Sequence, residues 1–193
     1  MIQKVGKGGG SMDETKRPTD RKADAAMNLT EEERLLLEEA DSQYIGTYNH
    51  TVDSKGRLVI PQAFREMLGD TFFIAPTRDL KAIGLYSRLN WARTRRRYAQ
   101  LDPVNNDVLL FLEQFTALSF RDQECDAQGR ILLPTMLRTL MLEDEKDLIV
   151  SGEIDHVRIM SAEKYYARFR QVQTDMSEMM KTMDRLRARE LNL

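Results

Sequence analysis

Short runs of β-branched, aromatic and other apolar residues alternate with turn residues along most of the chain. Runs of this length and composition are typical of strands. Four of them predict strands in the first half of the chain, namely "YIGTYNHTV" (44–52), "RLVI" (57–60), "TFFIA" (71–75) and "AIGLY" (82–86). Between them, Pro61 presets the first turn of a short helix that ends at Leu68 before Gly69, and Ser87 caps a helix through Gln100.

The same order of elements returns later in the chain. "DSKGRLVIPQAFR" (53–65) recurs 73 positions on as "DAQGRILLPTMLR" (126–138), with Asp, Gly, Arg, Pro and a second Arg at the same relative positions. "ALSFRDQEC" precedes the second motif as a predicted strand, Pro134 begins a helix to about Leu142, "DLIVSG" and "VRIM" predict strands, and Ser161 caps the last helix. We interpret the chain as two copies of a βαββ unit of about 45 residues, which suggests internal pseudo-symmetry.

The two copies divide the chain into five segments. Residues 1–43 are polar and Gly-rich and are expected to be a disordered, acidic extension, apart from a short helix at Thr30 with capping-box spacing to Glu33. The first repeat follows at 44–90 and the second at 117–162. Residues 91–116 form a helical connection in which Asp102–Pro103 predicts a helix start, with Val104, Val108, Leu112 and Phe115 on one face. Residues 163–193 form a C-terminal helix.

Most of the repeated motif has a purely structural explanation. Asp53 and Asp126 can accept N–H bonds inside a type I turn, and Gly56 and Gly129 can adopt positive φ and close a hairpin with a bulge. Backbone geometry does not require Arg after Gly. The structural alternative for Arg57 and Arg130 is a surface ion pair with the turn Asp, whereas the functional one is an outward fork for phosphates or guanine edges.

Neighbouring residues of the motif extend this comparison. Lys55 adds a positive charge to the first turn, where the second has Gln128, so the second turn is expected to be electrostatically weaker. Arg65 and Arg138 also recur, and they could brace the hairpin or pair with Asp53 and Asp126, with phosphate contact as the alternative.

Composition excludes several classes of protein. The net charge of −2 over 193 residues gives no global signal for nucleic acid, so any DNA binding requires a local basic patch. No apolar run approaches the length of a membrane span, and the single cysteine fits a reducing cytosol. The two histidines lie far apart without a carboxylate cluster, and no nucleophile, P-loop or dinucleotide motif is present. We therefore expect no catalytic residue, metal site, cofactor, membrane contact or small-molecule substrate.

The doubled D-x-x-G-R hairpin, together with "GTYNHTVDSKGRLVIPQAFR" and the aromatic Trp91 after the first repeat, resembles the MraZ family of bacterial transcriptional regulators over about residues 44–166. The resemblance implies an α+β fold with two AbrB-type (SpoVT–AbrB) swapped-hairpin β-barrel units and a homo-oligomeric ring. It also implies repression of the division and cell-wall gene cluster by binding short direct repeats in double-stranded promoter DNA, in the cytoplasm at the nucleoid. The family's DNA-contacting motif maps onto Asp53 and Arg57 and onto Asp126 and Arg130, and we add Lys55, Gly56 and Gly129. Family members usually begin near the position of Tyr44, so the N-terminal extension departs from the pattern.

Other features leave alternatives open. The runner-up function is an AbrB-like antitoxin or protein-partner module, against which the two copies in one chain argue, and a purely structural ring is a third. "SRLNWARTRRRYAQ" is expected to be a solvated helix with Leu89, Trp91 and Tyr98 facing inward, or else an accessory phosphate contact. The last helix carries an apolar seam that packs on its own subunit or on a neighbour, formed by Phe169, Val172, Met176, Met179, Met183 and Leu186.

Overall fold

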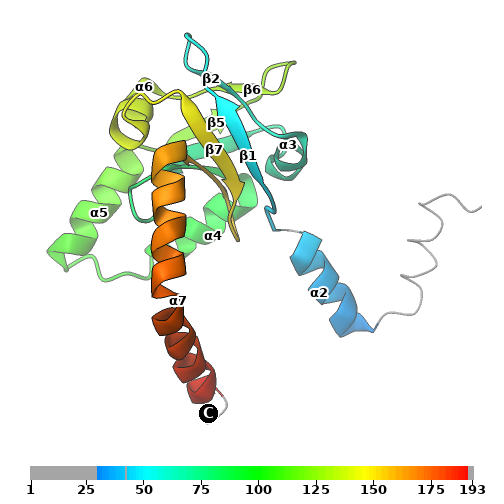
Figure 1. Ribbon diagram of the computed structural model, residues 1–193, viewed down its shortest axis with the longest axis vertical. Helices are drawn as coiled ribbons and strands as arrows, with labels where there is room; N and C mark the ends of the chain where they lie inside the picture. Colours follow the sequence, from blue (N-terminus) through cyan, green and yellow to red (C-terminus); the bar gives the residue numbers. More distant parts are fainter. Residues whose placement is uncertain (1–29, 42, 191–193) are drawn as a thin grey trace, which may run out of the picture. The chain divides into compact units, whose positions relative to one another are not determined.

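The structure, a computed structural model, describes residues 30–41 and 43–190 (Figure 1). The first part is the helix α2 (Glu31–Asp41). Its start is the predicted capping box, because the Thr30 N–H donates to Glu33 Oε2 at 2.8 Å and the Glu33 N–H donates to Thr30 Oγ1 at 3.2 Å. The expectation of disorder for the residues before Thr30 lies outside the described residues.

The second part has mixed α+β structure, which confirms the predicted class. Its elements are β1 (Thr47–Thr51), β2 (Arg57–Val59), α3 (Gln62–Leu68), β3 (Phe72–Pro76), β4 (Ile83–Ser87), α4 (Arg88–Tyr98), α5 (Asn106–Ala117), β5 (Phe120–Gln123), β6 (Arg130–Leu132), α6 (Thr135–Leu137), the π-helical turn η1 (Arg138–Leu142), β7 (Asp147–Gly152), β8 (Val157–Ser161) and α7 (Ala162–Glu190). As predicted, Gly69 follows α3 with a φ of +78°, and Ser87 Oγ accepts from the Asn90 N–H at the start of α4.

The strands form a six-stranded sheet in the order β1-β7-β8-β4-β3-β5 and a separate antiparallel ribbon of β2 with β6. Each outer strand pairs with a strand from the opposite copy of the repeat, since β1 pairs with β7 and β5 pairs with β3. The central pair, β4 with β8, joins equivalent strands of the two copies. If each strand is replaced by its equivalent in the other copy, the same order results, read from the opposite edge of the sheet. The strand pairing therefore interleaves the two halves of the sequence.

This pairing corrects two expectations. The strand after each turn does not form a ladder with the strand before it, because β2 pairs with β6 while β1 pairs with β7. Nor do the strands of the described residues close into a hydrogen-bonded barrel, because β1 and β5 remain at the two edges of the sheet. A short turn could be predicted locally, but the strands on either side of each turn pair with strands of the distant copy.

The connecting helix also begins later than predicted. Its N-cap is Asn105, whose side chain accepts from the N–H groups of Asp107 and Val108, whereas Asp102 accepts from Val104 in the preceding turn. Val104 therefore lies before the helix and is exposed, while Phe115 is buried. Pro103 lies in that turn instead of at the first helical position.

Apolar residues from both copies share one core. Leu58, Ile60, Phe64 and Leu68 pack in the same cluster as their counterparts from the second copy, which are Ile131, Leu133, Leu137 and Met141. A second cluster holds α4 and α5 against the sheet through Tyr86, Phe115 and Trp91, with Trp91 stacked on Phe73 at a centroid distance of 4.7 Å. Leu89, predicted to face inward, is exposed.

Helix α7 begins beside the sheet and extends away from it, at the end opposite to β2 and β6 (Figure 1). Most of its apolar seam, including Phe169, Met176, Met179 and Met183, is exposed. Within residues 43–190 the seam is therefore largely uncovered, and packing on a neighbour stays a prediction. Of the helices in the described part of the chain, none is long and apolar enough to cross a membrane.

Candidate nucleic-acid interface

The first turn is organised around the carboxylate of Asp53. Its Oδ1 accepts the backbone N–H groups of Lys55 and Arg57, both at 2.9 Å, and the Gly56 N–H donates to the Asp53 carbonyl. Its Oδ2 accepts from Arg57 Nε and Nη2, both at 2.7 Å. Hydrogen bonds from the backbone N–H and the side chain of Arg57 lower the pKa of the Asp53 carboxyl to about 2, so it remains a carboxylate near neutral pH.

The second turn repeats this geometry. Asp126 Oδ1 accepts the backbone N–H groups of Gln128 and Arg130 at 2.9 Å, and its Oδ2 accepts from Arg130 Nε and Nη2 at 2.8 Å. The hydrogen bond from the Arg130 N–H is the main cause of a lowered Asp126 pKa. The structural alternative of the sequence analysis, an ion pair between each turn Asp and Arg, is therefore present in both copies.

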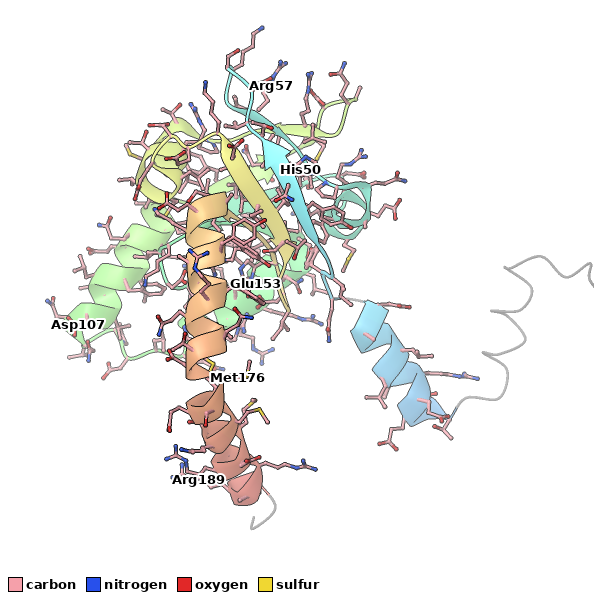
Figure 2. The ribbon with its side chains drawn as sticks, viewed as in Figure 1. His50, Arg57, Asp107, Glu153, Met176 and Arg189 are labelled. Carbon is pink, nitrogen blue, oxygen red and sulfur yellow. The ribbon has the colours of Figure 1, made fainter. Side chains whose placement is uncertain are left out.

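This ion pair leaves part of each guanidinium available. An Arg side chain has five N–H donors in a planar fork, and Asp53 occupies the Nε–H and one N–H of Nη2. The two donors of Nη1 and the second donor of Nη2 remain, and one donor from each nitrogen forms the end of the fork, whose spacing matches two phosphate oxygens or O6 and N7 of guanine. The carboxylate thus holds the guanidinium in one orientation, and Arg57 lies in the upper part of the molecule near the turns (Figure 2).

The register of β2 with β6 puts both arginines on one face of the ribbon. Arg57 is opposite Leu132 and Val59 is opposite Arg130, and residues directly opposite or two apart share a face. On the other face, Leu58 and Ile131 are buried in the core. Arg57 and Arg130 are therefore diagonal neighbours, with Cα atoms roughly 7–8 Å apart, and the two turns leave the ribbon at its opposite ends.

Two apolar residues complete the exposed face of the ribbon, and sequence reasoning missed them. Val59 is 41% exposed and Leu132 is 61% exposed, between the two arginines. The alternation of the strand could have indicated them, because Val59 and Leu132 stand two residues after Arg57 and Arg130. Without the β2–β6 pairing, however, nothing placed them side by side.

The second pair of arginines crosses between the copies. The guanidinium of Arg65 lies against Gly129 and that of Arg138 lies against Gly56, while both glycines have positive φ. The suggested pairing with Asp53 and Asp126 is wrong, because Arg138 pairs instead with Asp144 at 3.9 Å and no ion pair of Arg65 occurs in residues 43–190. Each arginine braces the turn of the opposite copy and adds a positive charge beside it.

One face of the basic helix α4 packs against the rest of the fold. Asn90 and Thr94 are buried on it, Trp91 packs against Tyr86, and Arg97 pairs with Asp155. Arg88, near Asp122, is largely exposed. This arrangement fits the expected solvated helix face, and the accessory phosphate contact stays untested.

Comparison with known proteins identifies relatives of this chain. A family profile described as "MraZ protein, putative antitoxin-like" matches residues 44–108. The chain is 36% identical over 122 residues to the "Transcriptional regulator MraZ" of Alkaliphilus metalliredigens, a match covering 63% of this chain and 83% of that protein. Proteins of the same name from Alkaliphilus oremlandii and Limosilactobacillus fermentum are 38% and 35% identical, over 61% and 63% of this chain and 80% and 83% of theirs.

Proposed function

Because this chain belongs to the MraZ family, whose relatives are named transcriptional regulators, we propose that it regulates transcription by binding double-stranded DNA through the exposed face of the β2–β6 ribbon and its two flanking turns. The observation that carries the proposal is the repeated Asp–Arg unit, whose carboxylate orients the guanidinium and leaves its outer edge available. As members of a family of regulators, such chains are not enzymes.

Local charge supports this surface despite the negative net charge of the chain. Lys55, Arg57 and the bracing Arg138 outweigh Asp53 at the first turn, whereas Arg130 and the bracing Arg65 face Asp126 at the second. A two-stranded ribbon fits the major groove, where arginine reads guanine and apolar side chains contact the thymine methyl group. Val59 and Leu132 would make the apolar contacts, and Arg57 and Arg130 the polar ones.

We further propose that the two halves are duplicated, interleaved AbrB-like units and that several copies of the chain assemble. The interleaved strand order supports the first point, and the exposed seam of α7 supports the second. A ring would present many ribbons to short direct repeats in a promoter, and linked sites raise avidity by about 10²–10⁴ when their spacing matches. Following the resemblance, the targets would be division and cell-wall genes, and the action repression at the nucleoid.

The test measures binding to DNA upstream of the chain's own gene as a function of salt, for the wild type and for Arg57→Ala, Arg130→Ala and the double variant. Each lost bidentate base contact should cost about 1–3 kcal/mol, and a lost phosphate contact should lower the salt slope by about 1. Arg57→Ala should have the larger effect, because the first turn also carries Lys55. Arg121→Ala, which removes an exposed arginine elsewhere in the sheet, is the matched control.

Equal binding by the wild type and the double variant would refute the proposal. The profile's description as antitoxin-like and the exposed seam of α7 favour one second candidate, a module that binds a protein partner. It predicts that the wild type binds no promoter DNA at any salt concentration and that a partner protein is captured by α7 or α2.

A further inference from the structure

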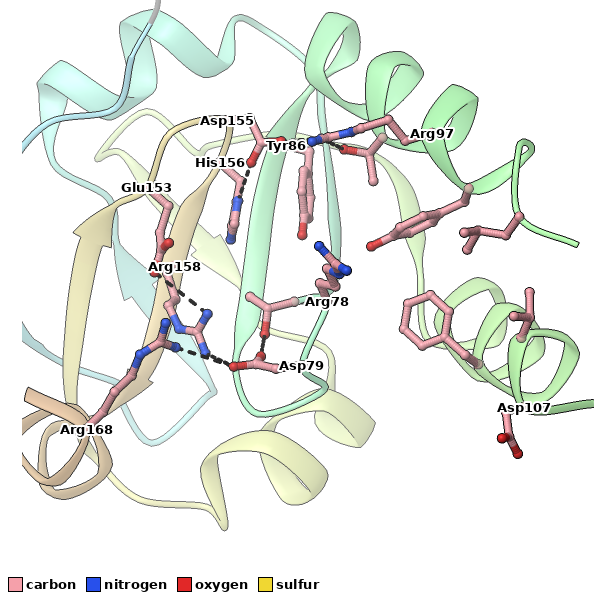
Figure 3. Close-up of a pocket in the computed structure, with 16 residues that line it drawn as sticks. Arg78, Asp79, Tyr86, Arg97, Asp107, Glu153, Asp155, His156, Arg158 and Arg168 are labelled. Atoms are coloured by element: carbon pink, nitrogen blue, oxygen red, sulfur yellow. Dashed lines mark hydrogen bonds and ion pairs between the residues drawn. The ribbon is translucent and has the colours of Figure 1, made fainter. Parts of the chain in front are cut away.

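A cavity of about 770 Å³ lies at the end of the sheet away from the ribbon. It is lined by the β3–β4 turn, α4, α5, the β7–β8 turn and the first part of α7 (Figure 3). The register places it there, because Thr51, next to the first turn, pairs with Asp147, whereas Thr47 pairs with Ser151 just before the β7–β8 turn. None of its lining residues belongs to the proposed DNA surface.

The polar side of the cavity is built on a buried arginine. The side chain of Arg158 is only 6% exposed, with Nη2 at 2.8 Å from Asp79 Oδ2 and Nη1 at 3.7 Å from Glu153 Oε1. Its Nε is buried without a hydrogen-bond partner among the described residues. A buried charged group with an unpaired donor is costly, and this one forms part of a cavity wall.

The other side of the cavity is aromatic and aliphatic. His156 stacks on Tyr86 with a centroid distance of 4.9 Å, and its Nε2 is a second buried atom without a partner in the described part of the chain. Tyr98 and Phe111 meet edge to face at 5.3 Å, and Val108 lies beside them in the lining. This wall would receive an apolar or aromatic body and leave its polar end toward the arginines.

Most charges in the lining are paired, and the two exceptions among the described residues are Arg78 and Asp107. Asp79 is held by Arg158 and Arg168, and Asp155 by His156 and Arg97. Arg78 lies near the middle of the close-up, where no hydrogen bond or ion pair joins it to the other lining residues drawn (Figure 3), and its positive charge acts on the Tyr98 hydroxyl. Asp107 lies at the edge of the cavity in Figure 3, away from Arg78, so the unpaired charge near the centre is positive.

We propose that this cavity binds a small organic acid, with its carboxylate or phosphate on Arg78 and its apolar or aromatic body against Tyr98, Phe111 and Val108. Bidentate pairing with guanidinium suits both kinds of acid. The inference rests on the cavity alone and stands whether or not the ribbon binds DNA.

The experiment uses the full-length protein and two probes that share one body, 2-naphthoate and the cation 2-naphthylmethylammonium. Trp91, the only tryptophan in the sequence, packs on Tyr86 of the cavity wall at 5.7 Å, so its indole N–H cross-peak in ¹H–¹⁵N spectra reports binding. We expect 2-naphthoate to move this peak with a Kd of roughly 1 mM, and the cation to leave it in place. Inorganic phosphate and 2-naphthyl phosphate distinguish an acid with a body from a free anion.

The variants are Arg78→Ala, Arg78→Lys and Val108→Trp, because Arg78 is exposed and its removal leaves the core intact. Arg78→Ala should weaken 2-naphthoate binding about tenfold or more, Arg78→Lys should restore part of it, and Val108→Trp should block it by filling the cavity. Arg57→Ala/Arg130→Ala and Arg121→Ala should bind as the wild type does. Equal response to both probes, unchanged binding by Arg78→Ala, or a Trp91 peak that moves only with protein concentration, as when a second copy covers the cavity, would each overturn the proposal.

Discussion

The guanidinium of Arg65 lies against Gly129 of the opposite copy, so that a Cβ built on this glycine would come within 2.7 Å of Arg65 Cζ. Arg138 stands in the same relationship to Gly56, at 2.9 Å. Each turn is therefore shaped by an arginine that belongs to the other half of the sequence. The repeated Gly has two functions, since it permits a positive φ and leaves room for this side chain.

A double-mutant cycle on Arg65 and Gly129 should reveal this contact. Gly129→Ala alone should lower the free energy of unfolding by more than the roughly 1–2 kcal/mol that a Cβ at positive φ costs, because the alanine also displaces the guanidinium of Arg65. In an Arg65→Ala background, Gly129→Ala should cost only the backbone strain. Urea unfolding of the four proteins gives the coupling energy, and a coupling of zero would show that the guanidinium moves aside freely.

The β2–β6 ribbon should respond in opposite ways to substitutions on its two faces. Ile131→Ala, in the core, should lower the free energy of unfolding by about 2–5 kcal/mol. The adjacent Leu132→Ala should change it by less than about 0.5 kcal/mol but should weaken promoter binding. Chemical denaturation and a DNA titration of the two variants provide the comparison, and equal stability losses would contradict the register.

Stability should fall in acid between about pH 4 and pH 2. The pKa of Asp155 is lowered to about 2 by its hydrogen bond with His156. Burial alone would raise the pKa of Asp79, but hydrogen bonds from Thr77 and Arg158 outweigh it and lower this pKa to about 2 as well. Since both pKa values lie below those of the unfolded chain, the stabilisation is complete above about pH 4 and is lost as the pH falls through the folded values.

Denaturant midpoints from pH 2 to 7 test this dependence. Asp79→Asn should be less stable than the wild type at neutral pH, and its midpoint should fall less steeply below pH 4. A wild-type midpoint that stays constant between pH 4 and pH 2 would argue against the contacts of Asp79 and Asp155.

The seam of α7 should mediate contact between copies of the chain. Met179→Glu/Met183→Glu puts two charges on the exposed apolar face and should lower the mass of the assembly in sedimentation equilibrium while leaving helix content unchanged. Ser177→Glu, on the opposite side of the same helix, is the matched control. An assembly mass that the Met substitutions leave intact would assign the seam to another partner.

The sequence by itself determined the local structure of this protein. Asp53 and Gly56 specify their turn through hydrogen bonds that span four residues, Pro61 and Ser87 precede the helices that they predict, and the repeat predicts that each feature returns in the second half. Helix and turn signals are short-range, so they can be read from neighbouring residues. The exception was Asp102–Pro103, where Asn105 three residues later provides the stronger cap.

Only the tertiary structure decided which strands pair and which side chains meet. Strand pairing depends on contacts between residues far apart in the chain, and either copy offers equivalent partners, so the interleaving of β1 with β7 and of β2 with β6 could not be read from spacing. The same pairing placed Val59 and Leu132 between the two arginines, turned Arg65 and Arg138 toward the opposite glycines, and brought Arg78, Arg158 and Tyr86 into one cavity. Proximity in space follows from these long-range pairings, and the local sequence carries no record of it.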